Sequence, residues 1–592
     1  MKKIIILILL FYVSSSIIAQ NQDSKYFIKH YDWNRTDYVS DIYAKDDSTY
    51  FLTIVSRNLN EPWYNIGIIV NNDGAITKSN NYQYDTLSLV AGMISPLKNN
   101  FILSGAVLEL NGNALYNHYS FVDNMGNILH KSIADTTDYY SFIRGFLPNN
   151  NGYLVNGVHI DKVANIWSPR IITMNQDFEV TSITTYFDYK LNSHFTDIKP
   201  VPNEEGFFYV YGTKGWSLGS GDLMLLKMDN TGNRLWEETY NLDEITGENG
   251  QLGGEDLAGQ MLITQDGGFL LMAAAKLALG HRGYFLKLNN EREIEWTNDD
   301  RLFNKAGPTD AYELLDGSII CTGVYFWNGY DLETDMTRSD IDIQIAKIDN
   351  KGATLWQRTY GDLAHTDTGF GMVLTNNRLD GKDGFILVGR ANKDFGEADA
   401  YLVKTNCMGL LTEPKTSFSA EQDPDQALTY HFTNQSQYVY PDSIDGGHFL
   451  WDFGDGTTSE ELHPSHSYAN KGESRIVTLT AIVCSDTSRF DIKVITGEEI
   501  VGIEGVDGLP AFSFKMYPNP VSNGQVRIDY DLPKEGLLQL YDLQGKLMVN
   551  CQLLMVNDWV ELDLGDLESG MYLYRLVSYG RTLKSGKLVV ED

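Results

Sequence analysis

The sequence GDLMLLKMDNTGNRLWEETY at residues 221–240 decides the fold, because it recurs along the chain. A close copy is DIQIAKIDNKGATLWQRTY at 342–360, and looser copies are GYFLKLNNEREIEW at 283–296 and AYLVKTNCMG at 400–409. A fixed period in this range is typical of stacked structural repeats. The first turn residues of the copies lie 52 to 60 residues apart and are Asn71, Asp123, Asn175, Asp229, Asn289, Asp349 and Asn406.

Each repeat has the composition of four short strands. In the fifth copy, GQMLITQ at 259–265 and FLLMAAAK at 269–276 are separated by Gly267 and Gly268, and GYFLKLN leads to a strand ending near Trp296. Short apolar runs bounded by Gly, Asp and Asn predict strands joined by hairpins. Four strands per copy are typical of a propeller blade. The sequence therefore predicts an all-β fold with a seven-bladed β-propeller, and six or eight blades are the alternatives.

Both ends of the repeat region depart from the common pattern. The stretch KYFIKHYDW at 25–33 looks like an outermost strand without a blade, and the last copy lacks its outermost strand after Gly409. We expect strands from both ends to close the ring, which removes exposed strand edges. Trp236, Trp296 and Trp356 recur at one position of the outermost strand and are expected to pack between neighbouring blades.

Connection lengths distinguish the two faces of the predicted disc. Connections between first and second strands are tight, as at Asp266-Gly267, Asp316-Gly317 and Asp383-Gly384, and so are the turns between third and fourth strands. Connections between second and third strands, and between blades, are long. Both long classes emerge on one face, which is expected to carry the variable surface.

Aromatic residues mark two of these long loops as a candidate ligand-binding surface. Beside several acidic residues, the loops 325–342 and 213–221 contain Tyr325, Phe326, Trp327, Tyr330 and Trp216. Exposed aromatic side chains stack on sugar rings or anchor a protein partner. Packing of the loops against a neighbouring blade is the alternative. The acidic residues allow a calcium site but lack the regular ligand spacing of a calcium loop, so no cofactor is expected.

No motif in the sequence assigns a catalytic residue. Gly215–Gly219 matches the G-x-S-x-G pattern, but Ser217 lies between two predicted antiparallel strands instead of at a strand-to-helix turn. The His-Glu-x-x-His, phosphate-loop and dinucleotide motifs are absent from the sequence. Sequence motifs do not show which carboxylates from different blades come together in the fold. An enzyme is therefore disfavoured, and a secreted hydrolase or lyase with its site in the propeller channel is the alternative.

The N-terminus and the net charge indicate the compartment and exclude one class of partner. Residues 1–19 combine Lys2 and Lys3 with the apolar run 4–13 and the small Ala19, the layout of a secretory signal peptide. No later stretch is long enough to span a bilayer, so no transmembrane segment is expected in the mature chain. A net charge of −33 argues against nucleic acid, whose phosphates require Lys and Arg.

Four cysteines, Cys321, Cys407, Cys484 and Cys551, are scattered along the chain without a Cys-x-x-Cys spacing. This pattern argues against a disulfide scaffold or a zinc site. An exported chain could pair Cys407 with Cys484, and unpaired buried thiols are the alternative.

The segment after the repeats has its own strand pattern. WDFGDG at 451–456 is followed by HPSHSY at 463–468, and the run 476–482 is expected to be a strand buried on nearly both faces. These two motifs resemble the PKD domain family. The resemblance implies a small immunoglobulin-like β-sandwich with Trp451 in its core and a hairpin turn at Gly454-Asp455-Gly456.

The C-terminal segment contains four ordered motifs: Tyr517-Pro518-Asn519-Pro520, Leu540-Tyr541-Asp542 with Gly545-Lys546, Gly570-Met571-Tyr572, and Lys587-Leu588-Val589-Val590. They resemble the type A C-terminal sorting domain of the type IX secretion system of Bacteroidetes. The resemblance implies a compact β-sandwich, export by the secretion machinery, and removal of the tail by its sortase-like protease. Release or attachment to the outer-membrane surface would follow. A flexible linker gives a protease access, so cleavage is expected between the two last domains.

The predicted layout is a signal peptide (1–19), a β-propeller-like repeat domain (20–412), a PKD-like domain (413–497), a linker (498–511) and a type A sorting domain (512–592). The chain is expected to pass through the periplasm and to be secreted or attached to the outer-membrane surface. A binding or adhesion protein for a glycan or protein ligand is the predicted function. A structural role in an extracellular assembly is a further alternative.

Overall fold

The computed structural model describes residues 25–591 with gaps. It omits residues 1–24, 34, 58–62, 83–86, 98–99, 110–114, 135–139, 150–151, 162–163, 165, 190–191, 216–220, 247–255, 278–279, 299–306, 327–328, 332–335, 339–340, 362–366, 393–396, 441–446, 498–512, 522–523, 532–535, 543–545, 554–558, 566, 579–580 and 592. The predicted signal peptide and linker therefore lie outside the described residues. The chain divides into two compact units, residues 1–413 and 414–592.

Within the described residues, the first unit contains five four-stranded antiparallel sheets and one eight-stranded sheet. The eight-stranded sheet consists of two antiparallel groups of four, joined where Thr36 pairs parallel with Ala398. Each group of four strands is here called a blade, and the total number of blades in the ring stays a prediction. Blade 1 contains β2 (Thr36–Ala44), β3 (Thr49–Arg57), β4 (Tyr64–Asn71) and β5 (Ile76–Tyr82). Blade 2 contains β6 (Leu87–Leu97), β7 (Asn100–Glu109), β8 (Leu115–Asp123) and β9 (Ile128–Ala134). Blade 3 contains β10 (Tyr140–Asn149), β11 (Gly152–Asp161), β12 (Ile166–Asn175) and β13 (Val180–Thr185). Blade 4 contains β14 (His194–Pro200), β15 (Phe207–Lys214), β16 (Asp222–Asp229) and β17 (Arg234–Tyr240). Blade 5 contains β18 (Asp256–Ile263), β19 (Phe269–Leu277), β20 (Gly280–Leu288) and β21 (Ile294–Asn298).

Blades 6 and 7 complete the first unit. Blade 6 contains β22 (Asp310–Glu313), β23 (Ile319–Phe326), β26 (Ile341–Ile348) and β27 (Thr354–Tyr360). Blade 7 contains β28 (Asp367–Leu374), β29 (Phe385–Asn392), β30 (Ala398–Thr405) and β1 (Phe27–Tyr31). A two-stranded hairpin of β24 (Gly329–Asp331) and β25 (Met336–Arg338) is inserted in blade 6. The described helices are short: α1 (Leu242–Thr246) and the 3₁₀ turn η2 (Thr375–Asn377). The all-β prediction is confirmed.

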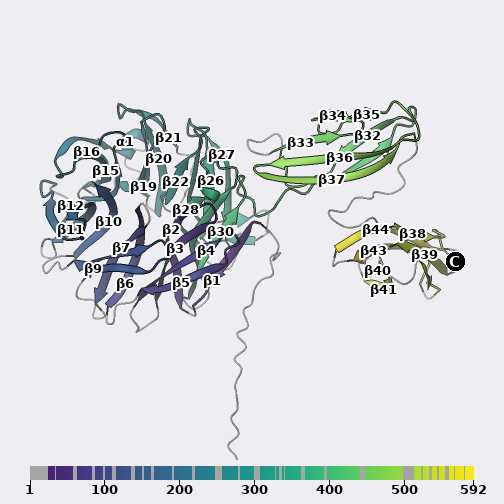
Figure 1. The fold of residues 1–592 in the computed structure, drawn as a ribbon, viewed down its shortest axis with the longest axis horizontal. Coiled ribbons are helices and arrows are strands. Elements are labelled where there is room, and N and C mark those ends of the chain that lie inside the picture. The colour runs from purple at the N-terminus through teal and green to yellow at the C-terminus, as the bar shows by residue number, and fades with distance from the viewer. Residues whose placement is uncertain are drawn as a thin grey trace, which may run out of the picture. The chain divides into compact units, whose positions relative to one another are not determined.

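The blades form a closed ring (Figure 1). The first strand of each blade lies beside the first strand of the next, in the order β2, β6, β10, β14, β18, β22 and β28, and β28 lies beside β2. Blade 7 is completed by β1 from the N-terminal end, which pairs antiparallel with β30 so that Phe27 is opposite Lys404 and Tyr31 is opposite Ala400. Strands from both ends of the repeat region therefore meet in one sheet, as expected from the sequence.

One turn geometry follows the third strand of every blade. The side-chain oxygen of the first turn residue accepts the backbone N–H groups two and four residues further on, at 2.8 to 3.1 Å. Asn and Asp recur there because their short polar side chains reach these donors. The residue three positions on has a positive φ in all seven turns: Gly74, Gly126, Phe178, Gly232, Arg292, Gly352 and Gly409.

The end of an outermost strand contacts this turn in the next blade. In five junctions of the described chain a Tyr hydroxyl donates to the carbonyl oxygen of the positive-φ residue, at 2.5 to 3.1 Å: Tyr31 to Gly74, Tyr82 to Gly126, Tyr186 to Gly232, Tyr240 to Arg292 and Tyr360 to Gly409. The Trp296 indole donates to the carbonyl of Asn350 at 2.9 Å, and the Arg292 guanidinium lies 4.6 Å from the Trp236 ring. The Trp356 ring lies 6.4 Å from that of Phe385 in blade 7, so all three recurring Trp residues pack between blades, as predicted.

One tight connection was predicted incorrectly. The turns at Gly267 and Gly317 each close with the same pair of backbone hydrogen bonds. Residues 375–384, in contrast, form a longer connection between β28 and β29 that includes η2. Here Gly384 does not mark a two-residue turn, and it takes a positive φ of 88° beside the next strand.

The second unit begins with a two-sheet β-sandwich. One sheet contains β31 (Phe418–Gln422), β32 (Thr429–Asn434) and β35 (Ser465–Ser467), and the other contains β34 (Thr458–Ser459), β33 (His448–Asp452), β36 (Ser474–Val483) and β37 (Asp486–Ile495). Trp451 is completely buried, and its indole donates to the carbonyl of Glu461 at 2.9 Å. In β36, Val477 and Leu479 are buried but Ile476 is 57% exposed. The expectation of burial on both faces is wrong, because a two-layer sandwich covers only one face of each sheet. Membership of the PKD family stays a prediction.

The C-terminal part forms two further sheets. One contains β38 (Ser513–Tyr517), β39 (Gln525–Asp531) and β42 (Trp559–Asp563), and the other contains β41 (Leu547–Leu553), β40 (Gly536–Tyr541), β43 (Gly570–Ser578) and β44 (Arg581–Val590). Their shared core includes Phe514, Ile528, Leu538, Leu540, Leu576 and Leu588. The peptide bonds before Pro518 and Pro520 are cis.

The structure describes two of the four cysteines as free thiols. Cys321 is a buried free thiol, and Cys551 is a partly buried one. The Cys407–Cys484 pairing that the sequence allows stays our prediction.

Candidate functional site

The structure describes part of the predicted aromatic surface. Tyr325 and Phe326 form the end of β23, and Tyr330 lies in the middle of β24, opposite Thr337 of β25. Trp216, Trp327 and Ser217 lie outside the described residues, so their relation to this segment stays a prediction. The described aromatic residues are thus supplied by one blade, at the inserted hairpin between its second and third strands.

A second group of candidate residues lies on the first strands of three blades and was missed by sequence reasoning. Asp41 of blade 1, Asp197 of blade 4 and Asp310 of blade 6 have matching hydrogen bonds. One carboxylate oxygen accepts the following residue's N–H at 2.8 to 2.9 Å. The other accepts an N–H of the next blade, from Ile94, Met261 or Met372, at 2.7 to 3.1 Å. Each carboxylate therefore clamps two neighbouring blades together.

A short sequence signal accompanies this clamp. Each Asp follows a Ser or Thr, and the pairs are Ser40-Asp41, Thr196-Asp197 and Thr309-Asp310. The hydroxyl donates to a carbonyl of the second strand, at 3.1 to 3.3 Å. The pair recurs at the first strand of a repeat, so an aligned comparison of the repeats could have found it. What the sequence could not show is the partner N–H in the next blade.

The clamp residues also interact near the centre of the ring. Lys199 Nζ lies 3.4 Å from the Asp197 carboxylate. Burial raises the pKa of Asp41 to about 6, against the opposing effects of its backbone N–H partners and of Lys199. Burial also raises the pKa of Asp310 to about 7, and the charge of Asp41 adds to this rise. These residues lie on the first strands of their blades, and the first strands of successive blades lie side by side around the ring.

Hydrogen bonding favours a structural role for these acids. Both oxygens of each carboxylate are occupied by backbone donors, and a general acid or base must be free to reach a substrate proton. Perturbed carboxyl pKa values also occur in structural networks, so the shifts alone do not indicate catalysis.

We predict that the propeller unit is more stable near pH 5 than near pH 8. A carboxyl whose pKa is raised on folding binds its proton more tightly in the folded state, so its stabilising contribution is complete below the unfolded pKa of about 4. That contribution is lost as the pH rises through the folded values of about 6 for Asp41 and about 7 for Asp310. The loss is at most about 1.4 kcal/mol per pH unit and per group.

Thermal unfolding of the full chain at pH 5, 6, 7 and 8 tests this prediction. Asp310→Asn should reduce the dependence of the melting temperature on pH. Asp123→Asn is the control. Burial raises the pKa of Asp123, but the hydrogen bonds that it accepts from Asn127 and Met125 outweigh this effect and lower the pKa. Asp123 therefore does not titrate in the same pH window as Asp310. An unchanged slope in Asp310→Asn would contradict the assignment.

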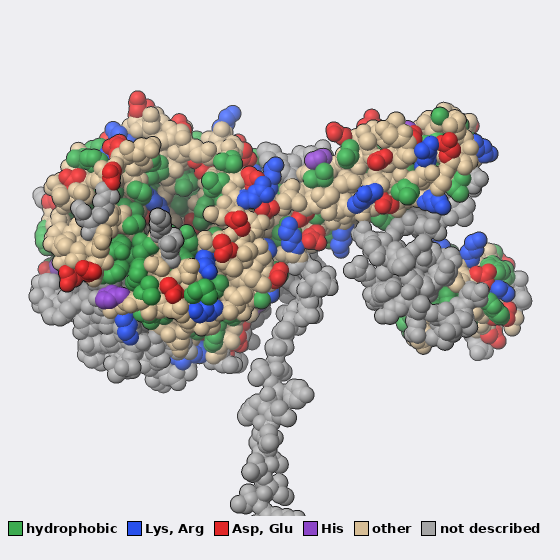
Figure 2. All heavy atoms as spheres, in the orientation of Figure 1, with side chains coloured by type: hydrophobic (Ala, Val, Ile, Leu, Met, Phe, Trp, Pro, Cys, Tyr) green, Lys and Arg blue, Asp and Glu red, His purple; other side chains and the backbone are tan. Residues whose placement is uncertain are grey.

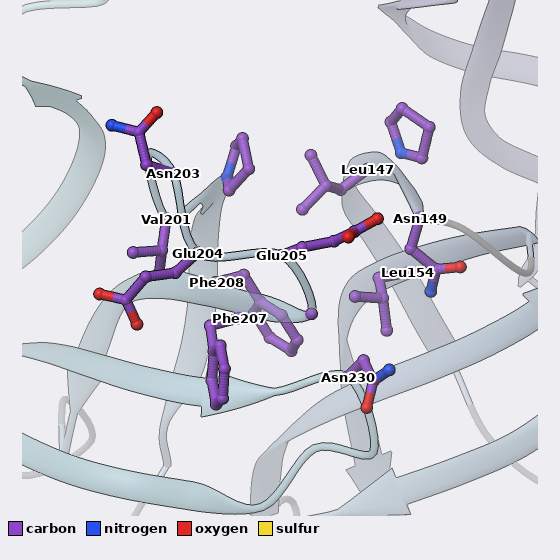
Figure 3. A pocket seen from close by; sticks show the side chains of 13 residues that line it. Leu147, Asn149, Leu154, Val201, Asn203, Glu204, Glu205, Phe207, Phe208 and Asn230 are labelled. Atoms are coloured by element: carbon purple, nitrogen blue, oxygen red, sulfur yellow. The ribbon is translucent and has the colours of Figure 1, made fainter.

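A cavity of about 430 Å³ lies between blades 3 and 4 on the face of the tight turns (Figure 3). Leu147, Leu154 and Phe208 provide apolar lining. Glu205 extends from the turn after β14 toward the opposite segment, while Glu204 is paired with Lys227 at 2.6 Å. The volume is in the range of small-molecule sites. The sequence contained no signal for it, because its walls come from hairpins of two different repeats.

The β-sandwich of the second unit contains a Ser, a His and an Asp within hydrogen-bond distance. His431 Nε2 lies 2.9 Å from an Asp423 oxygen, and His431 Nδ1 lies 2.7 Å from Ser465 Oγ. The His431 side chain is 51% exposed on an open strand pair. A hydrolytic triad needs preorganised oxyanion donors in a site that excludes water, so we interpret this arrangement as a surface hydrogen-bond network. Asp455 accepts bonds from Thr457 and His466 and acts as a turn residue.

The space-filling view shows acidic side chains scattered over the visible surface (Figure 2). Within the residues that the structure describes, no group of three or more His, Cys, Asp or Glu side chains could hold a metal ion. None of the helices in that part of the chain is long and apolar enough to cross a membrane.

The C-terminal motif residues are brought together by the fold. The Asn519 amide donates to the carbonyl of Lys587 at 3.0 Å, and its side-chain oxygen accepts the N–H of Val589 at 2.9 Å. Tyr572 is buried, and its hydroxyl donates to the carbonyl of Glu568 at 2.7 Å. Gly570 begins β43. Tyr517, Pro518 and Pro520 are exposed, and Gly545 lies outside the described residues.

Residues 515–591 match the family model of the secretion system C-terminal sorting domain. The chain is therefore an exported protein, a cargo of the type IX secretion system. It is delivered to the cell surface or the extracellular space, and its tail interacts with the secretion machinery.

Comparison with whole proteins gives weaker similarities. No curated protein matches the chain. Acylaminoacyl peptidase from Pyrococcus horikoshii matches with a TM-score of 0.35 at 13% identity, over 67% of this chain and 57% of that one, so this chain spans little more than half of it. The β-propeller domain of the Trilobed protease from Pyrococcus furiosus gives 0.35 at 11% identity, over 63% and 95%. A protein of unknown function from Dyadobacter fermentans DSM 18053 gives 0.37 at 10% identity, over 64% and 97%. Similarity at this level carries no argument about function.

Proposed function

We propose that this exported chain is a binding or adhesion protein whose propeller recognises a glycan or a protein outside the cell. The observation that carries the proposal is the inserted hairpin of blade 6. It places Tyr330 in a short strand pair between β23 and β26, next to the strand end formed by Tyr325 and Phe326.

Rigid placement matters for an aromatic contact residue. A side chain held on paired strands loses less conformational entropy on binding than one on an irregular loop. Aromatic rings also present a large apolar face with few rotatable bonds, which suits sugar rings and protein hot spots alike. The hairpin therefore supports recognition by this face of the ring, and Trp216 and Trp327 are proposed as its further contact residues.

The alternative, a hydrolase or lyase with its site in the propeller channel, has less support. The acids that converge near the axis are Asp41, Asp197 and Asp310, and backbone N–H groups occupy both oxygens of each. A substrate would have to compete with those bonds, and their loss would separate the blades. We propose the binding function ahead of the enzymatic one for this reason.

A glycan-array and extracellular-matrix binding screen tests the proposal with the mature chain. Tyr330→Ala and Trp327→Ala are expected to weaken the binding found with the wild-type chain by about tenfold or more, the cost of truncating an aromatic hot spot. Leu315→Ala is the matched control, because Leu315 is 65% exposed in the tight turn of the same blade, on the opposite face of the ring. Binding that survives both aromatic substitutions would refute this surface, and silence on every ligand would refute the adhesion role.

A further inference from the structure

We infer that the outer face of the tail sheet β41-β40-β43-β44 is the surface by which the type IX secretion machinery recognises this chain. The inference concerns delivery. It rests on the match to the sorting domain and holds whether or not the propeller binds a glycan.

This face carries a cluster of apolar side chains, here called the outer patch: Leu547, Tyr541, Leu573, Met571 and Val589. Tyr541 of β40 is opposite Leu547 of β41 on one side and Leu573 of β43 on the other. Met571 of β43 is opposite Val589 of β44. Residues directly opposite each other in antiparallel strands share a face. The five residues therefore lie in two adjacent rows on one surface, and the exposed Lys587 of β44 stands opposite Leu573 at the end of the longer row.

The outer patch is exposed although its members are apolar. Leu547 is 44% exposed, Met571 is 42% exposed and Leu573 is 41% exposed. Their neighbours Leu540, Tyr572 and Leu588 point to the other face and are buried in the core. Single exposed apolar residues are ordinary, but a contiguous apolar patch marks an interaction surface.

The outer face of the other tail sheet has a different character. It carries charged and aromatic side chains, four of which contact one another. Arg527 binds the Asp529 carboxylate at 2.7 Å, Tyr517 donates to the same carboxylate, and the Arg527 guanidinium lies 4.4 Å from the Trp559 ring. These four side chains therefore contact one another within the tail.

The motif residues Asn519 and Tyr572 have structural roles in the tail. The Asn519 side chain forms hydrogen bonds with backbone groups of β44, and the Tyr572 side chain is buried in the core of the tail. Of the outer patch, Tyr541 donates to Gln539 at 2.9 Å and lies 5.8 Å from the Arg575 guanidinium, and the side chains of Leu547, Met571 and Leu573 are apolar and more than 40% exposed. The motif strands β43 and β44 nevertheless display Met571, Leu573 and Val589 on their outer side. A domain matched as a secretion signal must present a surface to the export machinery. The outer patch fits a protein component of that machinery with an apolar groove.

Export of the full chain from a host with a type IX secretion system tests the inference. Leu573→Glu should reduce the amount of chain at the cell surface and in the medium by about tenfold or more, and the chain should accumulate in the periplasm with its tail attached. A tenfold loss corresponds to about 1.4 kcal/mol of binding free energy. Leu573→Thr, which keeps a good strand former and introduces no charge, should cause a smaller loss in the same direction.

Trp559→Glu is the matched control, because Trp559 is 45% exposed on the charged outer face and receives the same kind of substitution. It should be exported like the wild type. Resistance of the periplasmic variants to limited proteolysis shows that the tail is folded. Normal export of Leu573→Glu, or an equal defect in Trp559→Glu, overturns the inference. So does a defect in Leu573→Glu that is absent from Leu573→Thr and accompanied by a protease-sensitive tail. Export is measured without any ligand, so a failure here is distinct from a failure of the binding proposal.

Discussion

Replacement of Gly384 by alanine should lower the free energy of unfolding of the propeller unit by about 3 kcal/mol or more. Gly384 has a φ of 88°, a conformation that side chains with a Cβ rarely adopt. An added Cβ would also lie 1.9 Å from the carbonyl oxygen of Thr405, which belongs to the buried strand β30. That oxygen is backbone and cannot rotate away. The strand would have to shift between its neighbours β29 and β1.

Gly317→Ala separates the two contributions. Gly317 has a similar φ of 79°, but the nearest atom to its added Cβ, in Asn350, would be 3.8 Å away. Only the backbone penalty of about 1–2 kcal/mol is expected there. Denaturant unfolding of both variants, followed by the tryptophan fluorescence of the full chain, measures the difference. Equal destabilisation by the two substitutions would show that β30 is not held as tightly as described.

Removal of residues 20–33 should prevent the propeller unit from folding as a stable monomer. The deletion takes away β1, which pairs over five residues with β30 and carries the buried Tyr31. Tyr26 and Tyr31 are almost fully buried, and each large apolar side chain contributes about 1.5–3 kcal/mol. Together with the lost strand pairing, this is comparable with the whole stability of a domain, about 5–15 kcal/mol. The uncovered edge of β30 would also be available to a second chain.

Size-exclusion chromatography with light scattering, together with circular dichroism melting, measures this outcome. A chain that lacks only residues 20–24 keeps β1 and should behave as the wild type does. Tyr31→Phe should give a small, graded effect of about 1 kcal/mol, because it removes only the hydroxyl bond to Gly74. A monomeric deletion variant with an unchanged melting temperature would contradict the closure of the ring by β1.

Much of the architecture could be predicted from the sequence because its causes are local. The turn beginning at Asp229 or Asp349 satisfies its own N–H groups within four residues, so its composition is visible in each repeat. The same holds for short apolar strands bounded by Gly and Asn. The sorting domain was recognisable because its motifs have fixed residue types, and two of them, at Asn519 and around Lys587, are hydrogen-bonded to each other in the tail.

Two predictions were wrong because they depended on contacts with distant parts of the chain. Ile476 belongs to a long apolar run, but its exposure depends on whether a third layer covers the sheet, and none of the described residues does so in the two-layer sandwich. Gly384 resembles the turn glycine at Gly317 in sequence, yet the longer connection before it changes its environment. In both cases a local pattern was correct about the residue and wrong about its neighbours.

The sequence by itself determined the all-β class, the repeat that builds the ring, the strand taken from the N-terminal end and the delivery of the chain by its sorting tail. Only the tertiary structure decided the contacts between repeats. The bond from the Met372 N–H to Asp310 and the bond from the Tyr240 hydroxyl to Arg292 join residues of different blades, and the cavity beside Phe208 is lined by two blades. The outer patch likewise depends on the register of β40, β41 and β43. Such contacts join partners far apart in the chain, and hydrophobic periodicity records which face of a strand is buried but not which side chain buries it.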